Sequence, residues 1–314
     1  MTSGINRKSR ILEHLRTKEG AVSGQALSAQ LGVSRVSIWK HIQQLQALGY
    51  EITSSTKGYH LKKSPDVPYP WEFAGRESKV IYYAKLASTM DAAKELARKG
   101  CPDFTTVIAG RQTSGRGRLD RQWSSEKGGL YFTMVLRPDL PPVLSFRVGF
   151  LASLTLARIL NEMFGINVRV KWPNDLLVDE SKICGILSEL EAEADRVTFI
   201  NIGIGLNVNN NPPPIEPAAT SLKTILGVRV SQNDILSRYL DSFEAQMQAT
   251  AYDDVIERWK QFTVTLNRHV RVVTTREVYT GKAVDVDDTG ALILKCSDGS
   301  LKTIRYGDCF HQSC

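Results

Sequence analysis

Residues 110–123 of this 314-residue chain have the sequence Gly110-Arg-Gln-Thr-Ser-Gly-Arg-Gly-Arg-Leu-Asp-Arg-Gln-Trp123. Glycines and a single acid, Asp120, accompany four arginines: Arg111, Arg116, Arg118 and Arg121. Guanidinium groups this close repel one another, and glycines let the backbone approach a ligand, so the natural counterpart of the loop is a dense anion such as a polyphosphate. We predict a phosphate-binding loop that becomes ordered when its ligand binds.

The segments around this loop alternate between strand-like and helix-like patterns from Val80 to about Phe262. Residues 80–83 and 105–109 are rich in β-branched and aromatic residues, which favours strands. Ser88-Thr-Met-Asp91 has the spacing of a capping box and predicts a helix to about Lys99. A second helix is expected over 145–164. This alternation is typical of an α/β domain.

Charged side chains interrupt two apolar segments downstream of the loop, and glycines interrupt a third. Val168-Arg-Val-Lys-Trp-Pro-Asn-Asp175 places Lys171 and Asp175 at the end of a buried strand, where unpaired charges are costly. Lys171 suits a phosphate oxygen, and Asp175 a magnesium ion or a ribose hydroxyl; the alternative is an internal Lys171–Asp175 ion pair. Lys182-Ile-Cys-Gly-Ile-Leu187 carries one lysine on an apolar strand, and Gly203-Ile-Gly-Leu-Asn207 carries glycines where a ligand approaches.

The first part of the chain holds all of the formal net charge. Residues 1–64 contain ten Lys or Arg and three Glu, which equals the +7 of the whole chain. Ile11, Leu12 and Leu15 have helical spacing, a short helical segment runs from Ser23 to Leu31, and another helix starts at Ser34. This succession predicts a helix-turn-helix. Such a basic domain is expected to bind a polyanion such as DNA.

A β-hairpin is predicted after this helix-turn-helix, with strands near 50–53 and 59–61, and the combination is typical of a winged helix. We expect DNA contacts from the start of the second helix and from the hairpin, namely Ser34, Arg35, Ser37, Lys40 and Lys57. The alternative, a winged helix that only binds proteins, stays open, although the basic charge weighs against it.

Domain boundaries are expected where the composition changes. The Pro-rich stretch 64–70 marks the first boundary, and four short alternating strands within 269–305 predict a small C-terminal barrel. We therefore expect a DNA-binding domain at 1–64, a catalytic domain at 65–266 and a β-rich domain at 267–314.

Composition excludes several protein classes. With 42% hydrophobic and 23% charged residues the chain is typical of a globular protein. The longest apolar stretch, 148–160, is too short to span a membrane, and the first residues lack a signal peptide, so we expect a cytoplasmic protein without membrane contact. Five scattered cysteines and five scattered histidines fit neither a disulfide framework nor a zinc site.

Taken together, the arginine loop, Lys171-Trp-Pro-Asn-Asp175, Lys182-Ile-Cys-Gly-Ile-Leu187 and Gly203-Ile-Gly-Leu-Asn207 resemble the motifs of biotin protein ligases, in the same order. With the helix-turn-helix ahead and the β-rich tail behind, the full length is similar to the class that combines biotin ligase and biotin operon repressor. The resemblance implies an α+β multidomain protein: an N-terminal winged helix-turn-helix, a central mixed-sheet ligase domain and a C-terminal SH3-like small β-barrel.

The resemblance also implies a reaction. Biotin and ATP, with Mg²⁺, would form biotinyl-5′-AMP, and a lysine of the biotin carboxyl carrier protein of acetyl-CoA carboxylase would then accept the biotinyl group. Biotin's carboxylate is already anionic near neutral pH, so the absence of an obvious Ser or His nucleophile suits this chemistry. The protein has to neutralise charge between two anions. A homodimer that forms on binding the intermediate, and operator DNA as partner, are further expectations.

Site residues follow from the matching motifs. Arg116, Arg118 and Lys182 are expected to be catalytic, with Arg118 guarding the intermediate against hydrolysis. Biotin is expected to contact Ser88, Thr89, Met90, Gln112, Arg116, Gly117, Arg118, Lys182 and Gly185. ATP is expected to contact Arg121, Trp123, Lys171, Asn174, Asp175 and Asn207, with Asp175 also holding the metal. Arg305 is expected to reach ATP or the carrier.

Three positions depart from the family pattern. Met90 occupies a position where Asn is common, Asp120 one where Gly is usual, and Ala218-Ala219 the place where some members pack a Trp on the adenine. Two other functions compete with the ligase and repressor. One is a transcription factor that senses biotin without turnover, which the intact arginine loop and Lys182 disfavour. The other is a ligase for lipoate or an acyl chain, which typically carries an RxxGGGxVxH signature that is absent here.

Overall fold

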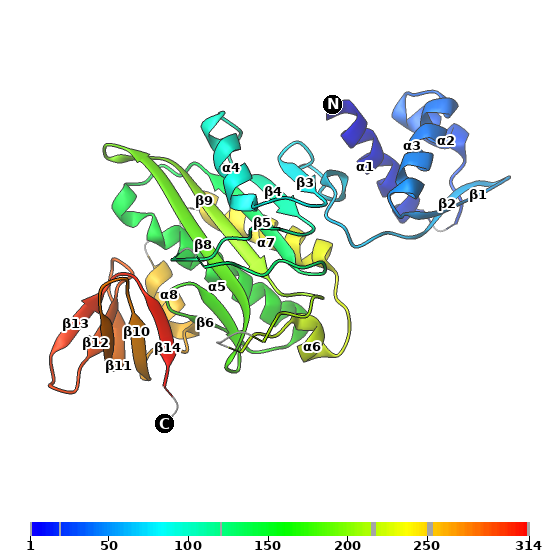
Figure 1. Cartoon of the computed structure of the whole chain (residues 1–314). Helices are drawn as coiled ribbons and strands as arrows, with labels where there is room; N and C mark the ends of the chain where they lie inside the picture. The colour runs from blue at the N-terminus through cyan, green and yellow to red at the C-terminus, as the bar shows by residue number, and fades with distance from the viewer. Residues whose placement is uncertain (1, 19, 120, 215–217, 250–253, 313–314) are drawn as a thin grey trace. The chain divides into compact units, whose positions relative to one another are not determined.

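The computed structural model describes residues 2–18, 20–119, 121–214, 218–249 and 254–312. The chain divides into two compact units, Met1–Tyr82 and Tyr83–Cys314 (Figure 1). Asp120, named above, and the last of the five cysteines, Cys314, lie outside the described residues.

The first unit contains three helices and a hairpin: α1 (Thr2–Thr17), α2 (Gly24–Leu31), α3 (Arg35–Ala47), β1 (Glu51–Ser55) and β2 (Gly58–Lys63). The side chains of Ser23 and Ser34 cap α2 and α3, and Gly32 ends α2 in a left-handed conformation. Ile38, Ile42 and Leu45 of α3 are buried against Ile11 and Leu27. The predicted helix-turn-helix is therefore confirmed, and an antiparallel hairpin follows it.

The segment that follows the Pro-rich stretch also belongs to the first unit. The short 3-10 helix η1 (Pro70–Glu72) carries Trp71, whose indole Nε1 donates a 2.9 Å hydrogen bond to the Tyr50 hydroxyl. Glu72 forms a 2.8 Å ion pair with Arg16 of α1, and Trp71 stacks on Tyr69. The compact unit extends to Tyr82 because these side chains pack back onto the helices.

A seven-stranded sheet has the order β3-β4-β5-β9-β8-β7-β6, and its strands from β4 onward belong to the second unit. Its strands are β3 (Val80–Tyr83), β4 (Thr105–Ala109), β5 (Leu130–Leu136), β6 (Val168–Lys171), β7 (Asp175–Val178), β8 (Ser181–Glu193) and β9 (Arg196–Leu206). In this order, every pair of neighbouring strands from β4 to β6 is antiparallel. A parallel bridge between Leu86 and Gln112 follows β3 and β4, so the sheet is mixed, as predicted.

Helices cover both faces of this sheet. Helix α4 (Thr89–Arg98) packs Ala93 and Ala97 against Val107 and Val135 on one face. Helices α5 (Phe146–Phe164), α7 (Gln232–Gln248) and α8 (Val255–Phe262) pack together (Figure 1), and Tyr239 of α7 contacts Phe132 of β5 from the opposite face. The short helices η2 (Pro142–Leu144) and α6 (Leu222–Leu226) complete the unit.

Helix α5, with the turn before it, is long and apolar enough by composition to cross a membrane. Residues 142–164 have a window of mean hydropathy 1.6, and 61% of that window is buried inside the protein. The helix ends at Gly165, and its side chains pack against β6, β8, α7 and α8. This burial is typical of the core helix of a globular domain.

The C-terminal sheet contains five strands, one more than predicted: β10 (His269–Val273), β11 (Val278–Val286), β12 (Leu292–Lys295), β13 (Leu301–Ile304) and β14 (Asp308–His311). Their order is β13-β12-β11-β10-β14, all antiparallel. Among the described residues β13 and β14 are not paired, so the sheet is open where a closed barrel was expected. Trp172 Nε1 donates a 3.0 Å hydrogen bond to the Gly290 carbonyl and so links this sheet to the β6–β7 turn.

Candidate active site and DNA-binding surface

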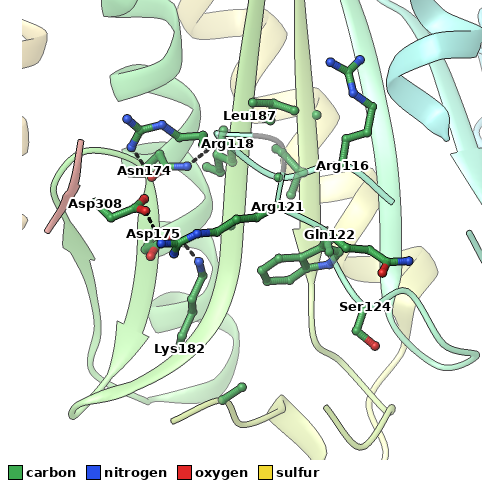
Figure 2. Close-up of a pocket in the computed structure, with 18 of the residues that line it drawn as sticks. Arg116, Arg118, Arg121, Gln122, Ser124, Asn174, Asp175, Lys182, Leu187 and Asp308 are labelled. Atoms are coloured by element: carbon green, nitrogen blue, oxygen red, sulfur yellow. Dashed lines mark hydrogen bonds and ion pairs between the residues drawn. The ribbon is translucent and has the colours of Figure 1, made fainter. Parts of the chain in front are cut away.

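A cavity of about 420 Å³ lies over the face of the central sheet that α4 also covers. Its walls come from the arginine loop, the β6–β7 turn, strands β8 and β9, and the start of β14. Figure 2 shows the side chains of Arg118, Arg121, Asn174, Asp175 and Lys182 gathered in it. The volume is in the range of pockets that hold small molecules.

A pair of glycines forms the floor of the cavity. Gly185 of β8 and Gly205 of β9 face each other in register, and both lie against the indole ring of Trp123. A Cβ atom at Gly185 would come within 2.9 Å of that ring, and one at Gly205 would collide with the indole nitrogen. The two glycines therefore leave the space that the Trp123 ring occupies. Trp123 Nε1 is buried without a hydrogen-bond partner in the described structure, so a donor is available beside the cavity.

The positively charged side chain of Arg118 forms part of the wall of the cavity. Its NH1 donates a 3.2 Å hydrogen bond to the Asn174 side-chain oxygen, and no ion pair among the described residues engages it. Burial lowers the pKa of the Arg118 guanidinium, while the charges of Asp308 and Asp175 oppose that shift. The guanidinium is thus largely shielded from water and has a neutral amide as its partner. An anionic ligand would stabilise a positive charge in such a place.

Two further cations of the cavity pair with carboxylates. Lys182 Nζ lies 2.7 Å from Asp175 Oδ1 and 5.2 Å from the centre of the Trp123 ring. Arg121 forms a 2.6 Å ion pair with Asp308 of β14. Figure 2 shows both contacts as dashed lines.

The alternative expectation of a Lys171–Asp175 ion pair is wrong, because Asp175 pairs with Lys182 instead. A register shift in the β7–β8 pair brings Lys182 opposite Leu177, on the same face as Asp175. Lys171 lines the cavity at only 5% exposure and has no ion pair among the described residues. It is therefore a second buried cation available to an anion.

The opposite end of the cavity is built from neutral hydrogen-bonding groups. The Thr89 amide and hydroxyl donate to the Gln112 side-chain oxygen at 2.7 and 3.0 Å, and Gln112 Nε2 donates to Ser125. The buried Thr133 hydroxyl donates to Thr89. Such fixed donors and acceptors suit an uncharged polar ligand group.

Most of the predicted ligand residues line this one cavity. They are Thr89, Met90, Gln112, Arg116, Gly117, Arg118, Arg121, Trp123, Lys171, Asn174, Asp175, Lys182, Gly185 and Asn207. Ser88 is not among the lining residues: it is 2% exposed and its hydroxyl caps α4 by accepting from the Asp91 amide. Arg305 is exposed and also lies outside the lining.

Two departures from the family pattern lie within the described cavity. Met90 is buried, and its sulfur packs on Gly203. Ala219 lines the cavity because the Lys182 amide donates to the Ala218 carbonyl and the Thr220 amide to the Lys182 carbonyl. Residues 215–217, next to this segment, are outside the described residues.

Sequence analysis missed Asp308, Cys309 and Phe310, which reach the cavity from β14. No motif marks them, and β14 itself was not predicted. Cys309 is 6% exposed, and its burial raises the pKa of its thiol to about 12; nearby Lys171 opposes this shift, and Asp175 and Asp308 add to it.

The first unit presents a separate surface on α3. Ser34 caps the helix by accepting from the Ser37 amide, and Arg35 and Lys40 are exposed. Val36 and Trp39 of the same helix are 62% and 51% exposed. Lys57 is exposed in the β1–β2 turn. An exposed basic helix with two large apolar side chains has the composition of a major-groove contact.

Comparison with known proteins relates this geometry to a family. Residues 82–209 match the biotin/lipoate A/B protein ligase family, residues 7–60 an HTH domain, and residues 265–312 the biotin protein ligase C terminal domain. The bifunctional ligase/repressor BirA of Bacillus subtilis is 34% identical over 296 residues, which cover 90% of this chain and 91% of that protein. The chain belongs to the biotin protein ligase family.

Other members of the biotin protein ligase family agree with this assignment. The bifunctional ligase/repressor BirA of Escherichia coli is 28% identical over 301 residues, 91% of each chain. A solved structure of the Aquifex aeolicus biotin protein ligase in complex with biotin and ATP is 27% identical, has a TM-score of 0.63, and covers 74% of this chain and 98% of that one.

Proposed function

We propose that this biotin protein ligase joins biotin to ATP, transfers the biotinyl group to a carrier lysine, and represses transcription through its helix-turn-helix. The observation that carries the enzymatic part is Arg118, a largely buried guanidinium with only a neutral amide as partner in the described structure. Lys171, Lys182 and Arg121 surround the same cavity. Four cations around one small cavity favour a ligand with several anionic oxygens.

In the first step a carboxylate oxygen of biotin attacks the α-phosphorus of ATP. The new bond is the mixed anhydride of biotinyl-5′-AMP, and the bond to pyrophosphate breaks. Arg118 and Lys182 reduce the repulsion between the two anions and stabilise the charge on the phosphoryl oxygens. Arg121, Trp123, Lys171, Asn174 and Asn207 form the nucleotide side. Thr89, Met90, Gln112, Gly117 and Gly185 form the biotin side, where the Thr89–Gln112 hydrogen bonds favour a neutral polar group.

The residues of the cavity also fit a magnesium ion. Asp175 offers a carboxylate next to the amide of Asn174, and Mg²⁺ is usually held by one or two carboxylates together with substrate phosphates. Among the described residues no cluster of three or more metal-ligating side chains occurs, so the nucleotide would supply most of the ligands. The ion would neutralise the part of the phosphate charge that the arginines do not neutralise.

In the second step the ε-amine of a carrier lysine attacks the biotinyl carbonyl. An amide bond forms, AMP leaves, and the amine loses a proton. We take the carrier to be the biotin carboxyl carrier protein of acetyl-CoA carboxylase, because related proteins named biotin--[acetyl-CoA-carboxylase] ligase share this part of the chain.

The repressor part of the proposal rests on the first unit. Helix α3 would enter the major groove with Ser34, Arg35, Ser37 and Lys40, and the β1–β2 hairpin would act as the wing, with Lys57 on phosphate. A homodimer matches a two-fold operator and would form when the intermediate binds. The C-terminal sheet is proposed to be an SH3-like module that adds β14 to the active site.

Pyrophosphate release tests the enzymatic part. We expect release from MgATP with biotin, little with lipoate, and a loss of at least a hundredfold in kcat/KM in Arg118→Ala, since charged groups aimed at the transition state contribute about that much. Arg196→Ala, which removes an exposed and distant cation, is the control. Biotin binding without pyrophosphate release would instead support a sensor that does not turn over its ligand.

A further inference from the structure

Arg116 differs from the other cavity arginines in the direction of its side chain. Figure 2 shows its guanidinium turned away from the side chains of Arg118 and Arg121. NH1 lies 2.8 Å from Asp91 Oδ1 of α4, and NH2 lies 2.5 Å from Glu189 Oε1 of β8. Both ends of the guanidinium are therefore occupied by carboxylates of the protein itself, and neither is directed at an anion in the cavity.

These two carboxylates come from elements on which the site is built. Helix α4 begins at Thr89 beside the neutral end of the cavity, and β8 carries Gly185 of the floor. Arg116 thus ties the arginine loop to two fixed walls at once. The loop has its own hydrogen bonds, from the Gly117 amide to the Arg121 carbonyl and from the Trp123 amide to the Gly115 carbonyl, at 2.7 and 2.8 Å. Anchoring Arg116 consequently places Arg118 and Arg121 as well.

The strength of this attachment suits a reversible closure. The Arg116 side chain is 39% exposed, and those of Asp91 and Glu189 are 59% and 22% exposed. Ion pairs of this exposure are individually weak and are screened by salt. Two pairs on one guanidinium therefore stabilise the observed position of the loop by a modest amount.

We propose that Asp91, Glu189 and Arg116 form a latch that holds the arginine loop over the bound intermediate and sets how fast biotinyl-5′-AMP escapes. The proposal rests on the ligase function proposed above. Arg116 is then a positioning residue, in place of the catalytic role expected from sequence, and Asp91 and Glu189 are positioning residues that no motif indicates.

The release rate of the intermediate tests the latch. Radiolabelled biotinyl-5′-AMP is formed on the full chain and chased with unlabelled biotin and ATP. We expect Asp91→Asn and Glu189→Gln each to release it about two- to fivefold faster, and the double variant about tenfold faster, in the range of partly exposed ion pairs. Added KCl should speed release more strongly from the wild type than from the double variant, because the ion pairs of Arg116 are screened only in the wild type, whereas the Arg121–Asp308 pair is screened in both.

Glu191→Gln is the matched control. Glu191 lies two residues further along β8 and pairs at 2.7 Å with Arg98 of α4, so its removal weakens the α4–β8 contact without touching the loop. We expect wild-type release from this variant. Equal acceleration in Glu191→Gln, or unchanged release in the double variant, would overturn the latch.

Limited trypsin digestion tests the latch without any ligand. The loop offers cleavage sites at Arg118 and Arg121, and the double variant should be cut there several times faster than the wild type and than Glu191→Gln. Unchanged cutting would contradict the latch. A wild type that forms no adenylate would contradict the proposed function, and the digestion would still decide whether the latch exists.

Discussion

Arg121 in the arginine loop and Asp308 in β14 form an ion pair of 2.6 Å, with the Asp308 side chain only 16% exposed. The last strand of the C-terminal sheet thereby takes part in a cavity whose other walls come from the arginine loop, the β6–β7 turn and strands β8 and β9. A residue more than a hundred positions away along the chain thus holds part of the proposed phosphate-binding loop.

Asp308→Asn should therefore weaken ATP use. Loss of the carboxylate leaves Arg121 without its partner, and we expect KM for ATP to rise about three- to tenfold with little change in the midpoint of urea unfolding. Asp139→Asn, at an exposed carboxylate near Arg196, should change neither quantity. If Asp308→Asn leaves KM unchanged, the pair has no part in nucleotide binding.

Lys182 should contribute to both catalysis and stability, because its ammonium group pairs with Asp175 at 2.7 Å. Lys182→Ala is expected to lower adenylate formation more than tenfold and to cost about 1–2 kcal/mol of unfolding free energy, since a partly buried carboxylate loses its partner. The double variant Lys182→Met, Asp175→Asn should regain stability and remain inactive. Recovery of activity in that double variant would show that Lys182 serves only the ion pair.

Cys309 should resist alkylation although it lines the cavity. Burial raises the pKa of its thiol to about 12. At pH 8 only about one thiol in ten thousand is then the reactive thiolate. In the unfolded protein the thiol ionises near pH 8.5, whereas in the folded protein it stays protonated up to about pH 12. The free energy of unfolding therefore falls as the pH rises from about 8.5 toward 12. Mass spectrometry after iodoacetamide treatment at pH 8 should find Cys309 unmodified until urea is added. Rapid labelling in the native protein would contradict its burial.

Trp39 and Lys40 should affect DNA binding in different ways. Lys40→Ala is expected to weaken binding and to reduce the slope of log K against log salt by about one unit, since a phosphate contact is lost. Trp39→Ala should weaken binding with the slope unchanged, because an apolar side chain, 51% exposed in the free protein, releases no counterions. DNA selected by the full chain from a random library, titrated at several salt concentrations, measures both. Identical slopes in all three proteins would remove Lys40 from phosphate contact.

Local signals in the sequence were sufficient for the helix-turn-helix and for most of the cavity. Ser34 caps α3, and Ile38, Ile42 and Leu45 define its buried side, all within one short segment. Gly185 and Gly205 lie on strands whose apolar patterns are plain, and the arginine loop is recognisable by composition alone. These features depend on neighbours in the sequence and were therefore accessible.

Features that depend on distant pairing were not accessible. Lys171 and Asp175 are opposite each other in the β6–β7 hairpin, yet Asp175 pairs with Lys182 because of the register shift in β7–β8. The short strand β14 carries no clear period, so Asp308 could not be placed in the site. Apolar and polar residues alternate along the C-terminal strands, as they do in a small barrel. This alternation does not determine whether the first and last strands of the sheet pair and close it.

Biotin transfer to a carrier tests the proposed ligase activity as a whole. The full chain is incubated with biotin, MgATP and the isolated carrier domain of a biotin-dependent carboxylase, and the carrier is analysed by intact-mass and peptide mass spectrometry. We predict one biotinyl group on one lysine, with one AMP and one pyrophosphate released per biotin, and at least a hundredfold slower transfer by Arg118→Ala than by Arg196→Ala. An unmodified carrier, or modification accompanied by ADP in place of AMP, would contradict the account.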